Sequence, residues 1–157
     1  GLSAGDSLTL YDLICGLLLQ SGNDCAAAIA EHISGSQEAF AEVMNTEAKQ
    51  LGATGTHFVN PHGLHDENHY TTTYDLYLMF NEALKDQAFL DIISMNSYTA
   101  KVTSADGTSY TPTWQATNYY SAGEATPPDG GRDRKKVRKS TADIGRHYDP
   151  HADICLT

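Results

Sequence analysis

The sequence contains no long apolar run, and its first residues lack the composition of an export signal. A membrane-spanning helix needs about 20 predominantly apolar residues. The longest apolar stretch here, Leu13 to Leu19, is much shorter and is interrupted by Gly16. Residues 1–6 include no basic residue and no apolar core of the kind found in signal peptides. We therefore expect neither an export signal nor a membrane anchor within these residues.

Cysteine is also scarce, with three residues that form neither a metal-binding spacing nor an even disulfide framework. Cys15 and Cys25 occur in apolar, helix-like contexts, whereas Cys155 lies near the end of the chain. The first two are expected to be small buried hydrophobic residues. A disulfide or a reactive thiol is the alternative.

Basic residues are few in positions 1–130, where three lysines face sixteen acidic residues and give a net charge of −13. Residues 131–157 differ, because seven basic residues against four acidic ones give +3. The acidic part should repel nucleic acid. The mixed charges of the basic part are only weak evidence for binding to an anionic partner. Nucleic acid is therefore not among the expected partners.

The part of the chain with clear periodicity is mostly helical. Thr9, with Asp12 three residues later, is typical of a capping box in front of an apolar helix. Asn23 or Asp24 is expected to cap the second helix, and Gly52 to end the third. Helices are predicted at 8–20, 25–33, 36–50, 72–84 and 86–94, with a short strand at 56–59, a β-hairpin at 98–111 around Asp106-Gly107 and a turn at 127–130.

The chemistry-bearing candidate is Ser21-Gly22-Asn23, which lies between two apolar helices. A hydroxyl and an amide at such a corner can relay a proton and hold a peptide carbonyl. The tripeptide alone is weak evidence, since Ser94-Met95-Asn96 repeats the pattern within the same chain. A helix stop followed by an N-cap is the structural alternative.

Longer strings connect this corner to a known family. The chain resembles the D-Ala-D-Ala carboxypeptidases of the low-molecular-mass penicillin-binding proteins (serine peptidase family S11). The resemblance covers roughly residues 2–130 and rests on the strings GDSLTLYDL, GLLLQSGND, AEHISGS, LGA followed by THFVNPHGL, HYTTTYDL and Thr117-Asn118. It implies a mostly α fold with a small β part. The chain would then be the helical portion of a β-lactamase/transpeptidase-like α/β domain, and that domain would be incomplete here.

The resemblance also implies a mechanism built on three motifs, Ser-x-x-Lys, Ser-x-Asn and Lys-Thr-Gly. The first supplies a serine nucleophile and the lysine that activates it. The second corresponds here to Ser21 and Asn23 as catalytic residues, with Asn23 also binding the substrate amide. The third would bind the substrate carboxylate and help to line the oxyanion hole.

Neither Ser-x-x-Lys nor Lys-Thr-Gly occurs in the sequence. We therefore expect this chain by itself to be inactive. By resemblance, its partners would be a peptidoglycan pentapeptide ending in D-Ala-D-Ala and β-lactams, with no cofactor. Its location would be extracytoplasmic, in the cell envelope, with membrane attachment only through a C-terminal anchor that this sequence does not contain.

The resemblance ends close to where the charge balance reverses. Residues 1–130 are therefore interpreted as a fragment of the catalytic domain. Residues 131–157 are interpreted as a basic tail, either frameshifted or disordered.

Two other functions compete with the carboxypeptidase interpretation. One is a metal-binding, histidine-rich loop, since His57, His62, His65 and His69 cluster and His62-x-x-His65 is a possible zinc spacing. Pro61 and Gly63 argue against it, because they make the segment a turn, and no metal site is expected. The other is a truncated, non-catalytic fragment that binds peptidoglycan peptides.

Overall fold

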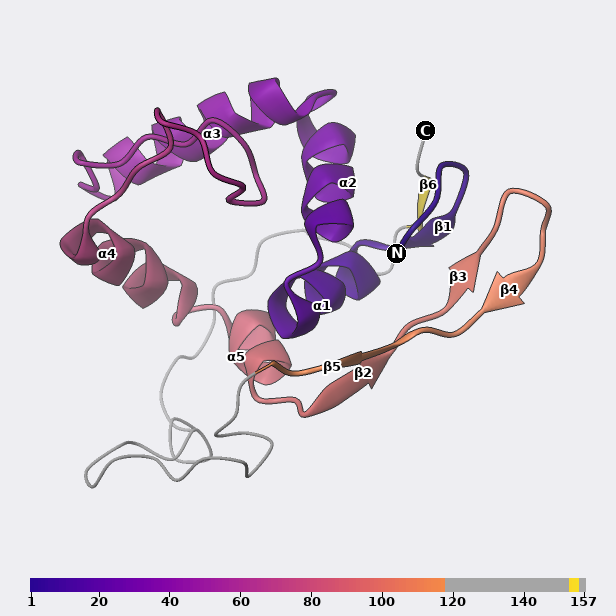
Figure 1. The fold of residues 1–157 in the computed structure, drawn as a ribbon. Coiled ribbons are helices and arrows are strands. Elements are labelled where there is room, and N and C mark those ends of the chain that lie inside the picture. Colours follow the sequence, from indigo (N-terminus) through magenta and orange to yellow (C-terminus); the bar gives the residue numbers. More distant parts are fainter. Residues whose placement is uncertain (118–152, 156–157) are drawn as a thin grey trace.

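The computed structural model describes residues 1–117 and the backbone of 153–155, and it is mostly helical with a small β part (Figure 1). This confirms the predicted fold class. In chain order the elements are β1 (Ser7–Thr9), α1 (Leu10–Gln20), α2 (Asn23–Ser34), α3 (Gln37–Gln50), α4 (Thr73–Ala83), α5 (Gln87–Ile93), β2 (Ser97–Thr99), β3 (Val102–Thr103), β4 (Ser109–Tyr110), β5 (Thr113–Gln115) and β6 (Asp153–Cys155).

Three helices begin where local sequence predicts. The Thr9 hydroxyl accepts from the amide of Asp12 at 3.0 Å, and the Asp12 carboxylate accepts from the Thr9 amide, so the predicted capping box is present. Ser36 caps α3 and Thr72 caps α4 through their side-chain oxygens. These interactions satisfy amides that have no partner inside the helix.

The start of α2 differs from the prediction. Neither Asn23 nor Asp24 is its N-cap, because the helix begins at Asn23 behind Gly22, which offers no side-chain cap. The Asp24 carboxylate instead accepts from the amides of Leu2 and Cys25 at 2.8 and 2.9 Å. A contact across 22 positions therefore takes the carboxylate that the local pattern assigned to the cap.

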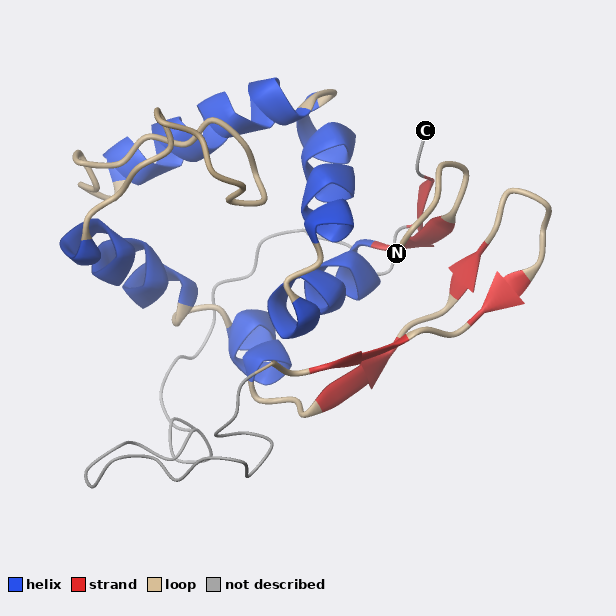
Figure 2. Cartoon of the chain, in the orientation of Figure 1, coloured by secondary structure: helices blue, strands red, loops and turns tan. Residues whose placement is uncertain are grey.

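Residues 97–115, from β2 to β5, form an antiparallel β-ribbon that contributes strands to two sheets (Figure 2). The predicted turn at Asp106-Gly107 is present, with Gly107 at a φ of +83°. At the base of the ribbon β2 pairs antiparallel with β5. Towards its tip β3 pairs with β4 and also with β1, which pairs on its other side with β6. The strand predicted at 56–59 is reduced to one bridge between His57 and Tyr70.

The core lies around α1, which contacts α2, α5 and strands of both sheets. One apolar cluster contains the buried residues Leu8, Leu10, Leu13, Cys25, Ala28, Ile29 and Val102, and a second contains Cys15, Leu19 and Ile92. The half-buried Trp114 packs against both clusters. Burial of one such Leu or Ile side chain contributes about 1.5–3 kcal/mol, so α1 carries much of the stability of the fold.

Cys15 and Cys25 are free and buried, as predicted. Burial raises the pKa of each thiol to about 12, and the carboxylates of Asp12 and Asp24 add to the respective shifts. The two sulfurs are therefore protonated at neutral pH and behave as apolar groups.

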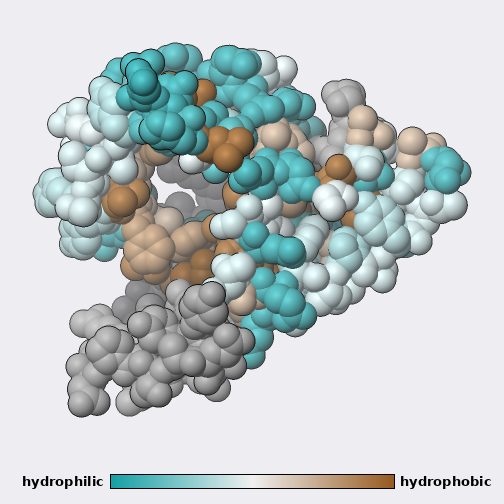
Figure 3. Space-filling view, in the orientation of Figure 1, coloured by the Kyte–Doolittle hydropathy of each residue, from teal (hydrophilic) through white to brown (hydrophobic). Residues whose placement is uncertain are grey.

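Helix α4 contributes little to this core. Its only buried residue is Asp75, whereas Tyr74, Leu76, Tyr77 and Phe80 are 51–66% exposed. Apolar atoms gather over α4 and α5 beside a hollow in the face of the molecule that Figure 3 shows. We call Tyr74, Leu76, Tyr77 and Phe80 the α4 apolar face.

Among the described residues, none of the helices combines the length and apolar character needed to cross a bilayer. Most of the predicted tail and the turn predicted at 127–130 lie outside the described residues. Asp153–Cys155, within the predicted tail, form β6.

Candidate active site

Ser21 and Asn23 lie at the corner between α1 and α2, and both are exposed. Ser21 follows α1 with a φ of +55°, and it is the only non-glycine residue with a positive φ in the described part of the chain. This left-handed conformation is unfavourable for a residue with a Cβ. It persists where the surrounding structure holds it, and such residues concentrate at functional sites.

The chain reverses at this corner through backbone bonds and close packing. The amide of Gly22 donates to the carbonyl of Gly16 at 3.2 Å. A Cβ at Gly16 would lie 2.7 Å from Cys25 Sγ and 3.2 Å from the ring of Trp114. Close approach of the two helices at Gly16 therefore sets the direction in which α2 leaves the corner.

The polar side chains of the corner have no hydrogen-bond partner among residues 1–117. In the described part of the chain, none of the hydrogen bonds involves the Ser21 hydroxyl or the Asn23 amide. Helices α1 and α2 also contain no lysine or arginine. The corner therefore presents a hydroxyl and an amide, and an activating base has to come from another segment.

Asp24 adds a negative charge behind the corner. Burial alone would raise the pKa of its carboxyl group, but the amides of Leu2 and Cys25 that donate to it bring the pKa below its ordinary value. The folded state thus binds the ionised form better than the unfolded chain does. The stabilisation is fully present above the unfolded pKa of about 3.9 and is lost as the pH falls through the lower folded pKa.

Replacement of Asp24 with asparagine is therefore expected to flatten the acid limb of the stability profile. Urea unfolding of both proteins at pH 6 and pH 3 measures this. The original chain should lose more of its free energy of unfolding between the two pH values than Asp24→Asn does. Equal losses would mean that Asp24 does not carry this part of the pH dependence.

A buried carboxylate supports α1 from the side of the β-hairpin. Asp12 accepts from the Tyr98 hydroxyl at 2.8 Å, a contact between residues 86 positions apart. Burial, followed by this bond and the charge of Asp12, raises the pKa of Tyr98. Tyr98 therefore stays a hydrogen-bond donor throughout the physiological pH range.

Two further buried polar residues hold the loop of residues 53–71. Asn45 pairs with the backbone of Phe58 in both directions, at 2.8 and 2.7 Å. Asp75 accepts from the Gly55 amide and the Thr56 hydroxyl at 2.8 and 2.7 Å. Sequence shows only that each is a polar residue within an amphipathic helix. Their burial depends on where the loop folds back.

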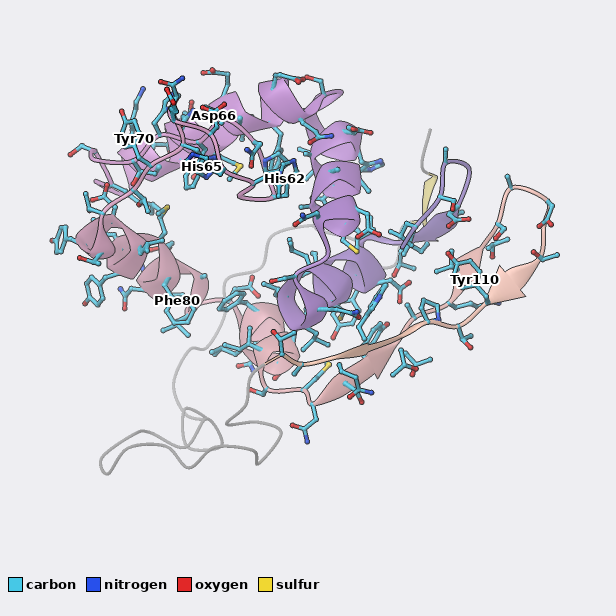
Figure 4. The ribbon with its side chains drawn as sticks, in the orientation of Figure 1. His62, His65, Asp66, Tyr70, Phe80 and Tyr110 are labelled. Carbon is cyan, nitrogen blue, oxygen red and sulfur yellow. The ribbon has the colours of Figure 1, made fainter. Side chains whose placement is uncertain are left out.

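The histidine-rich part of this loop is organised by local bonds. His57 Nδ1 lies 2.6 Å from the carbonyl of Asn68, and His62 Nδ1 and His69 Nδ1 accept from backbone amides at 3.3 and 3.4 Å. Figure 4 shows His62, His65 and Asp66 along the loop beside α3. Within the described residues, no group of three or more His, Cys, Asp or Glu side chains is arranged to hold a metal ion.

Comparisons with known proteins give a consistent picture. The family model described as D-alanyl-D-alanine carboxypeptidase matches residues 1–130. The chain is 45% identical over 84 residues to D-alanyl-D-alanine carboxypeptidase DacF of Bacillus subtilis, which is 54% of this chain and 22% of the relative. It is 35% identical over 124 residues to a D-alanyl-D-alanine carboxypeptidase of Streptomyces sp. strain K15, covering 74% of this chain and 43% of that one.

The fold shows the same likeness. The crystal structure of the Streptomyces K15 DD-transpeptidase superposes with a TM-score of 0.72 and 32% identity, over 78% of this chain and 49% of that one. The chain therefore spans less than half the length of these relatives.

Proposed function

This chain belongs to the D-alanyl-D-alanine carboxypeptidase family, and from that premise we propose that it forms part of a serine-type D-Ala-D-Ala carboxypeptidase that trims peptidoglycan stem peptides. In this role Ser21 and Asn23 supply the second of three motifs. The observation that carries the proposal is the exposed Ser21-Gly22-Asn23 corner, whose polar side chains have no partner among the described residues.

The chemistry of the corner follows from its groups. The Ser21 hydroxyl both donates and accepts, so it can pass a proton between an activating lysine and the departing amine of the terminal D-alanine. The Asn23 side chain offers an amide donor and a carbonyl acceptor, which suit a peptide bond of the substrate. The Ser21 hydroxyl is a weak nucleophile without an activating base, and the Asn23 side chain is not nucleophilic because its amide nitrogen is delocalised.

The serine nucleophile, its lysine and the carboxylate-binding motif would come from segments other than this sequence, which contains neither Ser-x-x-Lys nor Lys-Thr-Gly. We therefore propose that these 157 residues alone do not form an acyl-enzyme. Non-covalent peptide binding by the chain has less support, because tight sites need several converging groups in a concave pocket.

A fluorescent penicillin tests this claim directly. We expect no covalent adduct on the purified chain after denaturing electrophoresis, whereas a family member with all three motifs should label under the same conditions. Labelling of this chain, or release of D-alanine from a pentapeptide above a blank, would refute the proposed inactivity.

A test of the roles of Ser21 and Asn23 needs a protein that can be acylated. A chimera in which residues 1–117 replace the matching segment of the Streptomyces K15 enzyme provides one. Ser21→Ala or Asn23→Ala in that chimera should slow penicillin acylation by about 100-fold or more, the usual scale of lost proton transfer. Ser94→Ala is the matched control, because it changes the second Ser-x-Asn string. An equal loss in the control would remove the assignment of the motif to Ser21.

The proposed substrate is a pentapeptide ending in D-Ala-D-Ala, and β-lactams are proposed as its mimics. Both are found outside the cytoplasm, so we propose an extracytoplasmic location at the bacterial cell envelope.

A further inference from the structure

The base of the β-ribbon contacts the carboxyl-terminal half of α1, directly before the Ser21 corner. The ring of Trp114, on β5, lies against Gly16, where a Cβ would be 3.2 Å from ring atoms Cε2 and Cη2. Two residues after β5, the amide of Thr117 donates to the carbonyl of Leu19 at 3.1 Å. The last turn of α1 is therefore held by the ribbon through a ring and a backbone bond.

The ring of Trp114 is itself fixed from behind. Tyr98, on the paired strand β2, stacks on it with a centroid separation of 6.3 Å and an interplanar angle of 19°. The Tyr98 hydroxyl donates to the buried carboxylate of Asp12, and Tyr11 contacts the Tyr98 ring edge-on at 5.7 Å. The two rings thus form a stack that is anchored at its far end on the first turn of α1.

Gly16 connects this stack to the corner. The face of Gly16 that lacks a Cβ receives the Trp114 ring, and the carbonyl of the same residue accepts the Gly22 amide. Displacement of the ring would remove a packing contact from the residue whose carbonyl holds Gly22. Ser21, which precedes Gly22, is in a conformation that needs such support to persist.

We propose that Trp114, backed by Tyr98, is a positioning residue that braces α1 and holds the Ser21-Gly22-Asn23 corner in its catalytic geometry. The inference rests on the proposed function for the meaning of that geometry. It adds two residues outside the three family motifs. Because the brace acts on the backbone of the corner, it can be measured in this chain without any acylation.

Amide hydrogen exchange distinguishes a brace from ordinary core packing. In Trp114→Ala, exchange at the Gly22 and Thr117 amides should rise about tenfold more than at the Ala53 amide, which bonds Ala48 in another part of the fold. Trp114→Phe keeps a ring at this position and should restore most of the protection at Gly22.

Val102→Ala is the matched control, since it removes buried apolar volume from the same core at a residue of β3. It should raise exchange at Gly22 and Ala53 by similar factors. Equal increases at both amides in Trp114→Ala would show a purely structural role and overturn the proposal, as would unchanged exchange at Gly22.

Should Trp114→Ala fail to fold, Tyr98→Phe decides the question, because it removes only the hydroxyl that bonds Asp12. It should raise exchange at Gly22 and Thr117 while the Ala53 amide stays protected, and the absence of that local effect would overturn the proposal. Failure of the chimera to acylate penicillin would count against the proposed function and would leave these exchange results unchanged.

Discussion

Replacement of Gly16 with alanine is expected to destabilise the fold, because overpacking a tight contact usually costs about 1–3 kcal/mol. Helix propensity works in the opposite direction, since alanine is favoured over glycine by about 1 kcal/mol within a helix. The steric cost should win, because the new methyl group would lie 2.7 Å from Cys25 Sγ and 3.2 Å from Trp114. Urea unfolding followed by circular dichroism measures the net effect.

A double-mutant cycle identifies the clash as the cause. Cys25→Ala removes the sulfur that the new methyl group would meet, so Gly16→Ala should cost less in the Cys25→Ala background than in the original chain. The single Cys25→Ala variant supplies the reference. Purely additive effects, or a Gly16→Ala protein more stable than the original, would show that the helices do not approach as closely as described.

The α4 apolar face is expected to make the chain self-associate. Three aromatic rings and Leu76 are each more than half exposed along one helix. Large exposed apolar patches mark interaction sites or aggregation liabilities. We expect sedimentation coefficients that rise with concentration. The double variant Tyr77→Ser, Phe80→Ser should shift the chain largely to monomer, because it removes two of the three rings.

Val43→Ser is the matched control for this prediction, since Val43 is a 45% exposed apolar residue on α3. It should leave the sedimentation behaviour of the chain nearly unchanged. A monomeric original chain at high concentration would contradict the prediction, as would equal dissociation by the control.

Local signals in the sequence were sufficient for most helices. Thr9 caps the helix that it was expected to cap, and the helices predicted from residues 36 and 72 are capped by Ser36 and Thr72. Each of these interactions joins residues only three apart. The Asp106-Gly107 turn was found for the same reason. Short-range hydrogen bonds depend little on the rest of the fold, so a pattern of a few residues predicts them.

Long-range contacts account for what sequence could not predict. The cap expected from Asp24 fails because its carboxylate accepts from the Leu2 amide. The strand expected at 56–59 is limited because the Asn45 side chain bonds the backbone of Phe58 instead. The corner itself was found through resemblance to a family. Its left-handed Ser21 was not foreseen, and the role of Trp114 beside Gly16 depends on packing that sequence periodicity does not encode.

The bond between Tyr98 and Asp12 has a consequence for how the chain is made. Synthesis runs from the amino terminus, so α1 leaves the ribosome well before the tyrosine that bonds its first turn. During that interval the apolar side of α1 that later receives Trp114 is open to water and to chaperones. If the proposed brace holds the corner, a protease acting on nascent chains should cut near Ser21 until residue 117 is in place.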